Sequence, residues 1–187
     1  MKYELTDETN GSGLRRIRAL RDIPRCGVKE GDLGGWVESE GNLTQEGDCW
    51  VFDDALIYGD ARVSDDARVF DDAQVFDDAQ VFGNARVFGK ARVSDTAQVF
   101  GNARVCDAAQ VCGDARVFGI AIVGGNARVF DNAQVSDTAL IYGNAQVFGN
   151  ARVFGKARVF GNARVSDTAL IYGDARVFDD AQVFDDA

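Results

Sequence analysis

The stretch ARVFGKARVFGNARVSDT, residues 151–168, states one six-residue unit three times. From Val37 the chain divides into such hexads without an insertion or deletion, and 25 complete hexads end at Asp186. Position one is alanine in every hexad from Ala55 on, and position three is valine or isoleucine from Val51 on. Position five is glycine or aspartate throughout. Self-similarity at a fixed period is the sequence signature of a repeat architecture.

Each hexad has the pattern of a short strand followed by a corner. Side chains alternate along an extended chain, so positions one and three point inward while positions two and four point outward. Positions five and six are turn residues, because Gly and Asn tolerate a positive φ and Asp can close an Asx-turn. One short strand cannot bury its apolar side, but stacked coils can. The pattern therefore predicts an all-β stack of coils.

The spacing of a small residue and an aliphatic residue within a hexad resembles the hexapeptide repeat of left-handed parallel β-helices. The resemblance covers residues 37–187. It implies a triangular solenoid with three hexads in each coil and about eight coils, whose interior is too narrow for a ligand. The right-handed pentapeptide-repeat helix is the nearest rival, but its period of five does not fit.

Residues 1–36 lack the hexad pattern and form a separate N-terminal unit. Lys2–Glu8 and Leu14–Ile23 flank a strong turn signal, TNGSG, at residues 9–13. We expect a β-hairpin here, although the apolar spacing within residues 14–20 would also suit a short helix. Its expected role is to cover the open strand edges of the first coil.

The segment GVKEGDLGGWVESEGNLTQEGDCWV, residues 27–51, resembles the N-terminal region of the YdcK-like proteins. These are bacterial and phage hexapeptide-repeat proteins, largely without an assigned function. The resemblance therefore implies a fold and a possible phage relation, and it carries no chemistry with it.

The chain is acidic, with a formal net charge of −10 that comes from the hexad region. An acidic array repels nucleic acid and attracts basic surfaces, so we expect no direct nucleic-acid binding. Solubility alone also accounts for the charge. There is no run of 18 apolar residues, and the start lacks the basic-then-apolar order of a signal peptide. We expect a cytoplasmic protein without membrane contact.

The four cysteines are expected to be free thiols. Cys106 and Cys112 stand at equivalent positions of adjacent hexads, so they fall on different faces and are too far apart to bridge. Free thiols are typical of a reducing compartment.

The sequence argues against an enzyme. The best-known enzymes with left-handed β-helices are acyltransferases and γ-type carbonic anhydrases, which depend on histidine, and this chain has none. No GxSxG, HExxH, P-loop or CxxC pattern occurs. The position-four serines have no base near them in sequence and are read as solvated residues. We therefore predict no catalytic, cofactor-binding or metal-binding residues.

All 13 phenylalanines occupy the outward position four. Neighbours along one face are three hexads apart, which predicts two aromatic ladders: Phe52, Phe70 and Phe88, and Phe82, Phe100 and Phe118. Such stacks can stabilise the sheet, or they can form an adhesive surface for a partner. Both readings stay open at this point.

Position two carries mainly arginine or glutamine. Arg68, Arg86 and Arg104 are expected to lie beside the phenylalanines of the first ladder, where cation–π contacts are possible. Glutamine rows such as Gln80 and Gln98 can form amide ladders. Both patterns are sufficiently explained by the fold.

Acidic residues at the corners crowd one end of the solenoid. These are Asp53, Asp54, Asp60, Asp65, Asp66, Asp71, Asp72, Asp77 and Asp78. Such ridges could attract cations or imitate a phosphate backbone that faces a basic groove. Calcium is disfavoured, because the glycine-rich nonapeptide of calcium-binding β-rolls is missing.

Two functional hypotheses follow. The first is a non-enzymatic β-solenoid that binds another protein or itself, with a homodimer formed through the uncapped C-terminal coil at Ala187 or through the aromatic ladders. The alternative is a phage-encoded acidic inhibitor that mimics nucleic acid and blocks a nucleic-acid-binding host protein. Longer phrases recur at shifts that are not whole coils, as at 133–144 and 163–174, which argues against a ligand array on one face.

Overall fold

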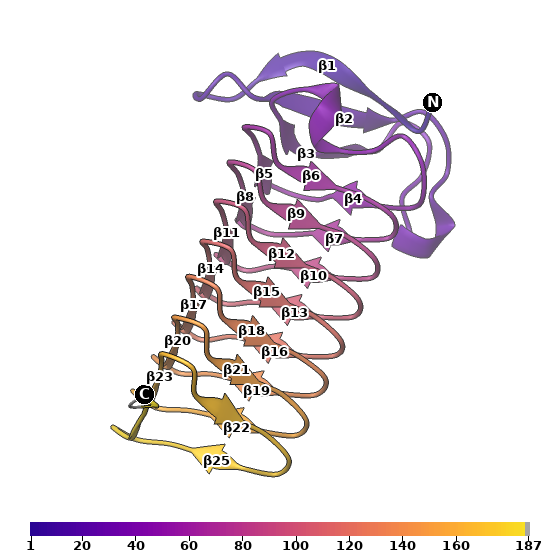
Figure 1. Ribbon diagram of the computed structural model, residues 1–187. Coiled ribbons are helices and arrows are strands. Elements are labelled where there is room, and N and C mark those ends of the chain that lie inside the picture. The colour runs from indigo at the N-terminus through magenta and orange to yellow at the C-terminus, as the bar shows by residue number, and fades with distance from the viewer. Residues whose placement is uncertain (186–187) are drawn as a thin grey trace.

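The computed structural model describes residues 1–185 as an antiparallel hairpin followed by a stack of parallel β-coils (Figure 1). Each coil contains three short strands, and paired strands are three hexads apart, as in the pair Arg86–Arg104. The predicted all-β solenoid of about eight coils is therefore confirmed. Asp186 and Ala187, which end the repeat, lie outside the described residues.

The first part of the chain forms the cap of the solenoid. Its elements are β1 (Tyr3–Thr9), β2 (Arg15–Ala19), η1 (Pro24–Cys26), β3 (Leu33–Val37) and η2 (Glu40–Asn42). β1 and β2 pair antiparallel, so the hairpin is confirmed and the helical alternative for residues 14–20 is wrong. β3 pairs antiparallel with β2 and parallel with β5 (Leu56–Ile57), which joins the hairpin to the coils.

Three parallel sheets form the faces of the solenoid. The first face continues from β3 through β5, β8 (Gln74–Val75), β11 (Arg92–Val93), β14 (Gln110–Val111), β17 (Arg128–Val129), β20 (Gln146–Val147), β23 (Arg164–Val165) and β26 (Gln182–Val183). The second face contains β4 (Trp50–Val51), β7 (Arg68–Val69), β10 (Arg86–Val87), β13 (Arg104–Val105), β16 (Ile122–Val123), β19 (Leu140–Ile141), β22 (Arg158–Val159) and β25 (Arg176–Val177). The third face contains β6 (Arg62–Val63), β9 (Gln80–Val81), β12 (Gln98–Val99), β15 (Arg116–Val117), β18 (Gln134–Val135), β21 (Arg152–Val153) and β24 (Leu170–Ile171).

Each two-residue strand consists of hexad positions two and three. The backbone N–H groups of positions two and four, and those of position six at most corners, donate to carbonyl groups of the next coil. In one hexad these donors are Arg86, which bonds to a carbonyl at 2.9 Å, and Phe88, which does so at 3.0 Å. The corner residue Asn84 repeats the contact at 2.7 Å. Hydrogen bonds at alternate residues explain why the hexads tolerate no insertion, since one extra residue would break the register of every later coil.

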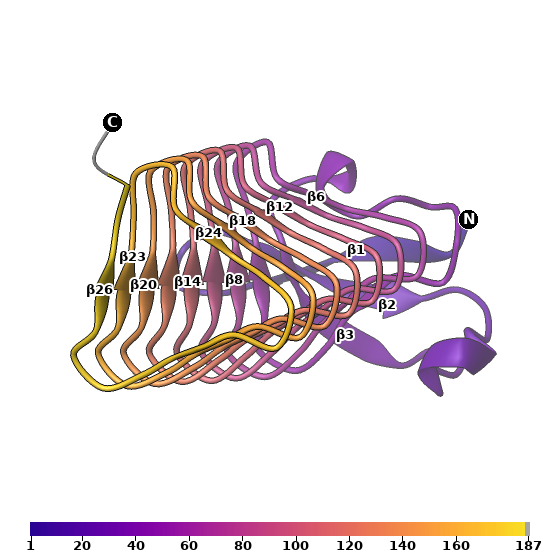
Figure 2. The same ribbon diagram turned by 60° about the horizontal axis from the view of Figure 1, so that its bottom comes forward.

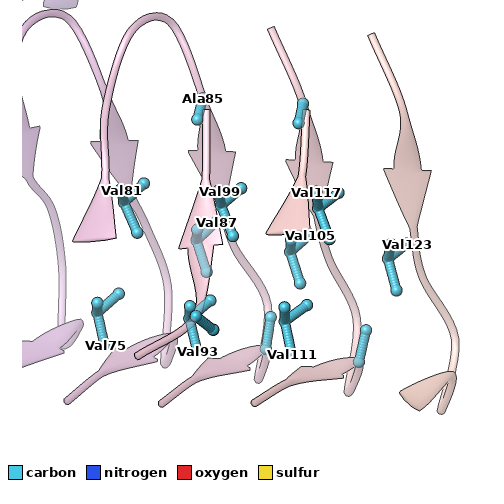
Figure 3. Close-up of a cluster of buried hydrophobic side chains, with 14 of the residues drawn as sticks. Val75, Val81, Ala85, Val87, Val93, Val99, Val105, Val111, Val117 and Val123 are labelled. Atoms are coloured by element: carbon cyan, nitrogen blue, oxygen red, sulfur yellow. The ribbon is translucent and has the colours of Figure 1, made fainter. Parts of the chain in front are cut away.

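The interior is filled by the alanines and valines of positions one and three (Figure 3). Val75, Val81 and Val87 come from three successive faces and point inward, and each is fully buried. Burying a valine side chain contributes about 1.5–3 kcal/mol, so these rows are the main source of stability. Alanine at position one keeps the coil narrow, because a larger side chain would meet the valines of the other faces.

Position five adopts a left-handed backbone at each corner of the coils. Asp53 has φ 52° and Gly59 has φ 66°, and the same conformation recurs in aspartate or glycine up to Asp179. The cost of this conformation is lowest for glycine and is also low for aspartate, whose short polar side chain can form hydrogen bonds with nearby backbone. The left-handed corner is therefore the reason why position five contains only glycine or aspartate.

The cap lies at the N-terminal end of the stack of coils (Figure 2) and contacts the first coil through aromatic and polar side chains. Tyr3 is fully buried, its ring meets Trp50 edge-to-face at 6.5 Å, and its hydroxyl donates to the carbonyl of Leu43 at 2.6 Å. Burial also raises the pKa of the Tyr3 phenol far above its ordinary value. Lys2, the preceding residue, is 1% exposed. The hairpin thus brings its own side chains into the core of the first coil.

Candidate interaction surfaces

The acidic residues predicted as a ridge lie on three different corners. They all belong to the coils next to the cap, as expected. Asp53, Asp54, Asp71 and Asp72 follow the second face, Asp60, Asp77 and Asp78 follow the first face, and Asp65 and Asp66 follow the third face. They therefore lie along three separate edges of the solenoid and do not form one continuous acidic surface.

Aspartates at position five join successive coils. The carboxylate of Asp65 accepts the backbone N–H of Gly83 at 2.9 Å, and Asp71 accepts that of Gly89 at the same distance. Asp53 and Asp77 make the equivalent contact at 3.4 Å each. These bonds reach into the next coil, so the aspartates act between coils and not as local Asx-turns. The position-five carboxylates are thus used by the fold.

Two of the position-six aspartates contact the cap. Asp66 forms an ion pair with Arg25 at 2.6 Å, and Asp54 accepts the indole N–H of Trp36 at 3.4 Å. The members of the acidic cluster without a side-chain hydrogen bond or ion pair to any of residues 1–185 are Asp60, Asp72 and Asp78. Most of the acidic cluster therefore supports the cap and the corners.

The aromatic ladders are present in part. Phe82, Phe100 and Phe118 stack on the third face with ring centroids 4.9 and 5.0 Å apart and planes within 2°. On the second face Phe52 stacks on Phe70 at 4.6 Å. The expected continuation to Phe88 is wrong, because no ring stack joins Phe88 to another residue in the described part of the chain.

Further aromatic stacks lie outside these two ladders. On the first face Tyr58 stacks on Phe76 at 5.0 Å and Phe130 on Phe148 at 4.9 Å. On the third face Phe154 stacks on Tyr172 at 5.6 Å. The spacing of three hexads locates these pairs too, since each joins two position-four residues in adjacent coils.

Cation–π contacts form on the first and third faces. The guanidinium of Arg92 lies 5.0 Å from the ring centroid of Phe76, and that of Arg116 lies 5.3 Å from the ring centroid of Phe100. The arginines expected to make such contacts, Arg68, Arg86 and Arg104, make none within residues 1–185. The expectation was therefore wrong for all three of these arginines, which lie on the second face.

Amide ladders occur at the corners instead of in the glutamine rows. Gln80 and Gln98 are register partners, but their side chains form no hydrogen bond with each other in the described structure. Asn126, Asn144 and Asn162 form a ladder with N–O distances of 3.2 and 3.0 Å, which ends on Asp180 at 2.9 Å. Position six was recognised as a turn position, and its spacing of three hexads is the signal that predicts this ladder.

The row of position-four side chains on the second face is interrupted at Gly124. Gly124 stands where most hexads have an aromatic residue, and Tyr142 covers it: a methyl group built on Gly124 would lie 2.5 Å from the Tyr142 ring. The Tyr142 hydroxyl donates to the carboxylate of Asp107 at 2.7 Å, and Asp107 also accepts the N–H of Gly125. The pKa of Asp107 is lowered mainly by two hydrogen bonds. The bond from the Gly125 N–H has the larger effect, and the bond from the Tyr142 hydroxyl has the smaller one.

Cys106 lies beside this break. The pKa of its thiol is raised to about 11, mainly by burial and to a smaller extent by the negative charge of Asp107. Cys106 follows a strand of the second face and Cys112 one of the first, and all four cysteines are free, as predicted. A thiol with such a pKa is a poor nucleophile at neutral pH.

Residues 1–185 contain no group of three or more side chains suited to holding a metal ion. The same residues include no helix of the length and apolarity needed to cross a membrane.

The repeat matches a known family of protein repeats. The YdcK β-solenoid repeat matches residues 61–77, 79–95, 109–125 and 145–159, which together make up about a third of the chain. All four segments lie within the coils, and the first of them includes corners of the acidic cluster. No curated protein matches the sequence.

Proposed function

Because the chain is a YdcK-like β-solenoid repeat protein, we propose that it is a non-enzymatic module that associates with a second copy of itself. The observation that carries this proposal is the edge of the last described coil. Its strands β24, β25 and β26 pair with the preceding coil on one side, and no described residue pairs with their other side. A strand edge of this kind is a template for pairing with another chain.

The side chains around this edge are also suited to an interface. Leu170, Tyr172, Phe178 and Phe184 are each more than half exposed, whereas most of the equivalent aromatic residues in earlier coils are half-buried. A second copy placed edge to edge would bury both these apolar side chains and the backbone groups. A two-fold arrangement would make the contact self-complementary.

We propose a non-enzymatic role for two reasons, which are the amino-acid composition and the use of polar side chains in contacts within the fold. The chain has no histidine to act as a base near neutral pH. The acidic alternative receives less support, because the carboxylates lie on three corners and Asp66 is paired with the cap.

The test uses a proline at the edge. In earlier coils the N–H of position two bonds to the next coil, as that of Arg158 does to Ala175 at 2.9 Å, whereas the N–H of Arg176 has no described acceptor. Arg176→Pro should therefore remove an intermolecular donor and spare the fold. Light scattering after size exclusion should show a dimer for the parent chain and a monomer for Arg176→Pro, with unchanged circular dichroism.

Arg158→Pro is the matched control, since it removes a bond within the chain and should lower the melting temperature. A parent chain that remains monomeric at every concentration tested would sink the proposal. So would a dimer that survives in the well-folded Arg176→Pro variant.

A further inference from the structure

On two of the three faces the arginines of the coils are never register partners of one another. On the first face the register partners of arginines are glutamines: Arg92 pairs with Gln74 and Gln110, and Arg128 with Gln110 and Gln146. On the third face arginines are again separated by other residues. Within the described coils, neither of these faces has two arginines as register partners.

The second face departs from this rule. Arg68, Arg86 and Arg104 are consecutive register partners, and we call these three residues the arginine ladder. Neighbouring strands are about 4.8 Å apart. The backbone positions of the three arginines therefore span only two strand spacings, which brings three positive charges close together. Like charges directly opposite each other in a sheet destabilise it. An arrangement that the other two faces avoid therefore calls for a compensating anion.

A second pair of arginines on this face differs from the ladder. Arg158 and Arg176 are also register partners, near the C-terminal end. They line a hollow together with Asp174 and Lys156, and they extend over two coils only. The longest run of adjacent guanidinium groups in the described coils is therefore the arginine ladder.

The protein itself supplies little compensation for the charge of the ladder. Arg68 donates to the backbone carbonyl of Arg25 at 2.8 Å. Arg86 and Arg104 are exposed and have no side-chain hydrogen bond, ion pair or cation–π contact to any of residues 1–185. On the first face, by contrast, the guanidinium of Arg92 lies over a phenyl ring.

The ladder lines a polar groove of about 350 Å³ beside the cap. Its other lining residues are Arg25, Asp66, Asn84 and Asn102. The carboxylate of Asp66 is already paired with Arg25 at 2.6 Å. Arg25 also donates to the side-chain oxygen of Asn84 at 2.9 Å. The groove is thus lined by four guanidinium groups and a single carboxylate, on a chain whose net charge is −10.

We infer that the arginine ladder is a binding site for a phosphate-bearing anion. Guanidinium groups offer planar forks of N–H donors that match phosphate oxygens, and they remain charged at any physiological pH. Because the ladder extends over three coils, it suits a short chain of phosphates better than one isolated phosphate. Asn84 and Asn102 add amide donors to the lining of the groove. The site is separate from the strand edge at which self-association is proposed.

The central residue of the ladder provides the sharpest test. Arg86→Gln places there the residue that separates arginines on the first face, so the fold should be kept and the like-charge repulsion reduced. Titration calorimetry with tripolyphosphate at low salt should show saturable binding to the parent chain. Loss of a charge-assisted contact should weaken binding by about tenfold or more in Arg86→Gln.

Arg92→Gln is the matched control, because it removes the same charge from the first face, where the guanidinium lies over Phe76. It should leave tripolyphosphate binding unchanged. The anion should also raise the melting temperature of the parent chain and of Arg92→Gln, and do so less in Arg86→Gln.

Several results would overturn the inference. These are the absence of saturable binding, an affinity that Arg86→Gln leaves unchanged, an equal loss of affinity in the two variants, and binding of a single-stranded oligonucleotide without binding of tripolyphosphate. Orthophosphate at equal ionic strength distinguishes a phosphate chain from a single phosphate, and weaker binding of orthophosphate is the supporting result. None of these readouts depends on dimer formation.

Discussion

The side-chain nitrogen of Lys2 donates to the sulfur of Cys49 at 3.0 Å, and both side chains are buried beneath the cap. Lys2 Nζ has one further acceptor, the carbonyl of Glu46 at 3.3 Å. A buried polar group is costly without a partner, so the thiol is part of what holds the hairpin on the first coil. Cys49 occupies position one, where alanine stands in every hexad from Ala55 on.

Cys49→Ala should destabilise the cap although alanine fits this position in the repeat. Removing the sulfur leaves Lys2 Nζ with a single acceptor, and we expect a loss of about 1–3 kcal/mol in the free energy of unfolding. Denaturant unfolding measures the loss. In a Lys2→Met background the same substitution should cost much less, and an equal cost in both backgrounds would show that the contact contributes nothing.

Gly124 should tolerate no side chain while Tyr142 covers it. A methyl group at Gly124 would lie 2.5 Å from the tyrosine ring and 2.9 Å from the sulfur of Cys106. Gly124→Ala should therefore lower stability by about 1–3 kcal/mol through overpacking, as measured by thermal unfolding. In a Tyr142→Ala background the same substitution should cost much less. An equal cost in both backgrounds would show that the tyrosine is not the obstacle.

Asp107 should contribute to stability only while it is ionised. Its folded-state pKa is lowered from the ordinary 3.8, chiefly by the N–H of Gly125 and then by the hydroxyl of Tyr142. The contribution is therefore fully present above pH 3.8 and is lost as the pH falls through the lowered pKa. The melting temperatures of the parent chain and of Asp107→Asn should converge in acid. Asp60→Asn, at an exposed corner where the carboxylate has no described partner, is the control and should match the melting temperature of the parent chain at neutral pH.

Phe100 should contribute more to stability than Phe88, although both occupy position four. Phe100 stacks on Phe82 and Phe118 and lies under Arg116, whereas Phe88 has no stacked neighbour in the described structure. Each aromatic pair is worth about 0.5–1.5 kcal/mol, so Phe100→Ala should cost about 1–3 kcal/mol more than Phe88→Ala. Chemical unfolding of the two variants compares them. Equal losses would mean that the stacks add nothing beyond burial.

Much of the fold follows from the hexad period. The period of six, with alanine at position one and valine at position three, predicts that each hexad has an inward side and a corner. A coil of three hexads then aligns residues 18 apart, as in the pair Arg86 and Arg104. The aromatic stacks follow from the same alignment. The continuation to Phe88 was wrong because alignment brings two side chains to adjacent rungs and does not determine the rotamer of either one.

The candidate surfaces were less predictable than the fold. The sequence predicted turns and an acidic ridge for the aspartates at position five, but the carboxylates of Asp65 and Asp71 bond to the next coil. The partner of Asp66 is Arg25, which is distant in the sequence and belongs to the cap. The Arg25–Asp66 ion pair depends on where the hairpin folds back, and the period of the repeat does not describe that.

The sequence by itself determined the coil, because each hexad repeats the same choice between inward, outward and corner positions, and every backbone bond between coils depends on that choice. The tertiary structure alone decided which outward side chains remain available. Arg92 and Arg86 have the same position in their hexads, yet Arg92 lies over a phenyl ring and Arg86 lines an open groove beside the cap. The difference arises from the neighbours in adjacent coils and from the cap, which are brought together only when the chain has folded.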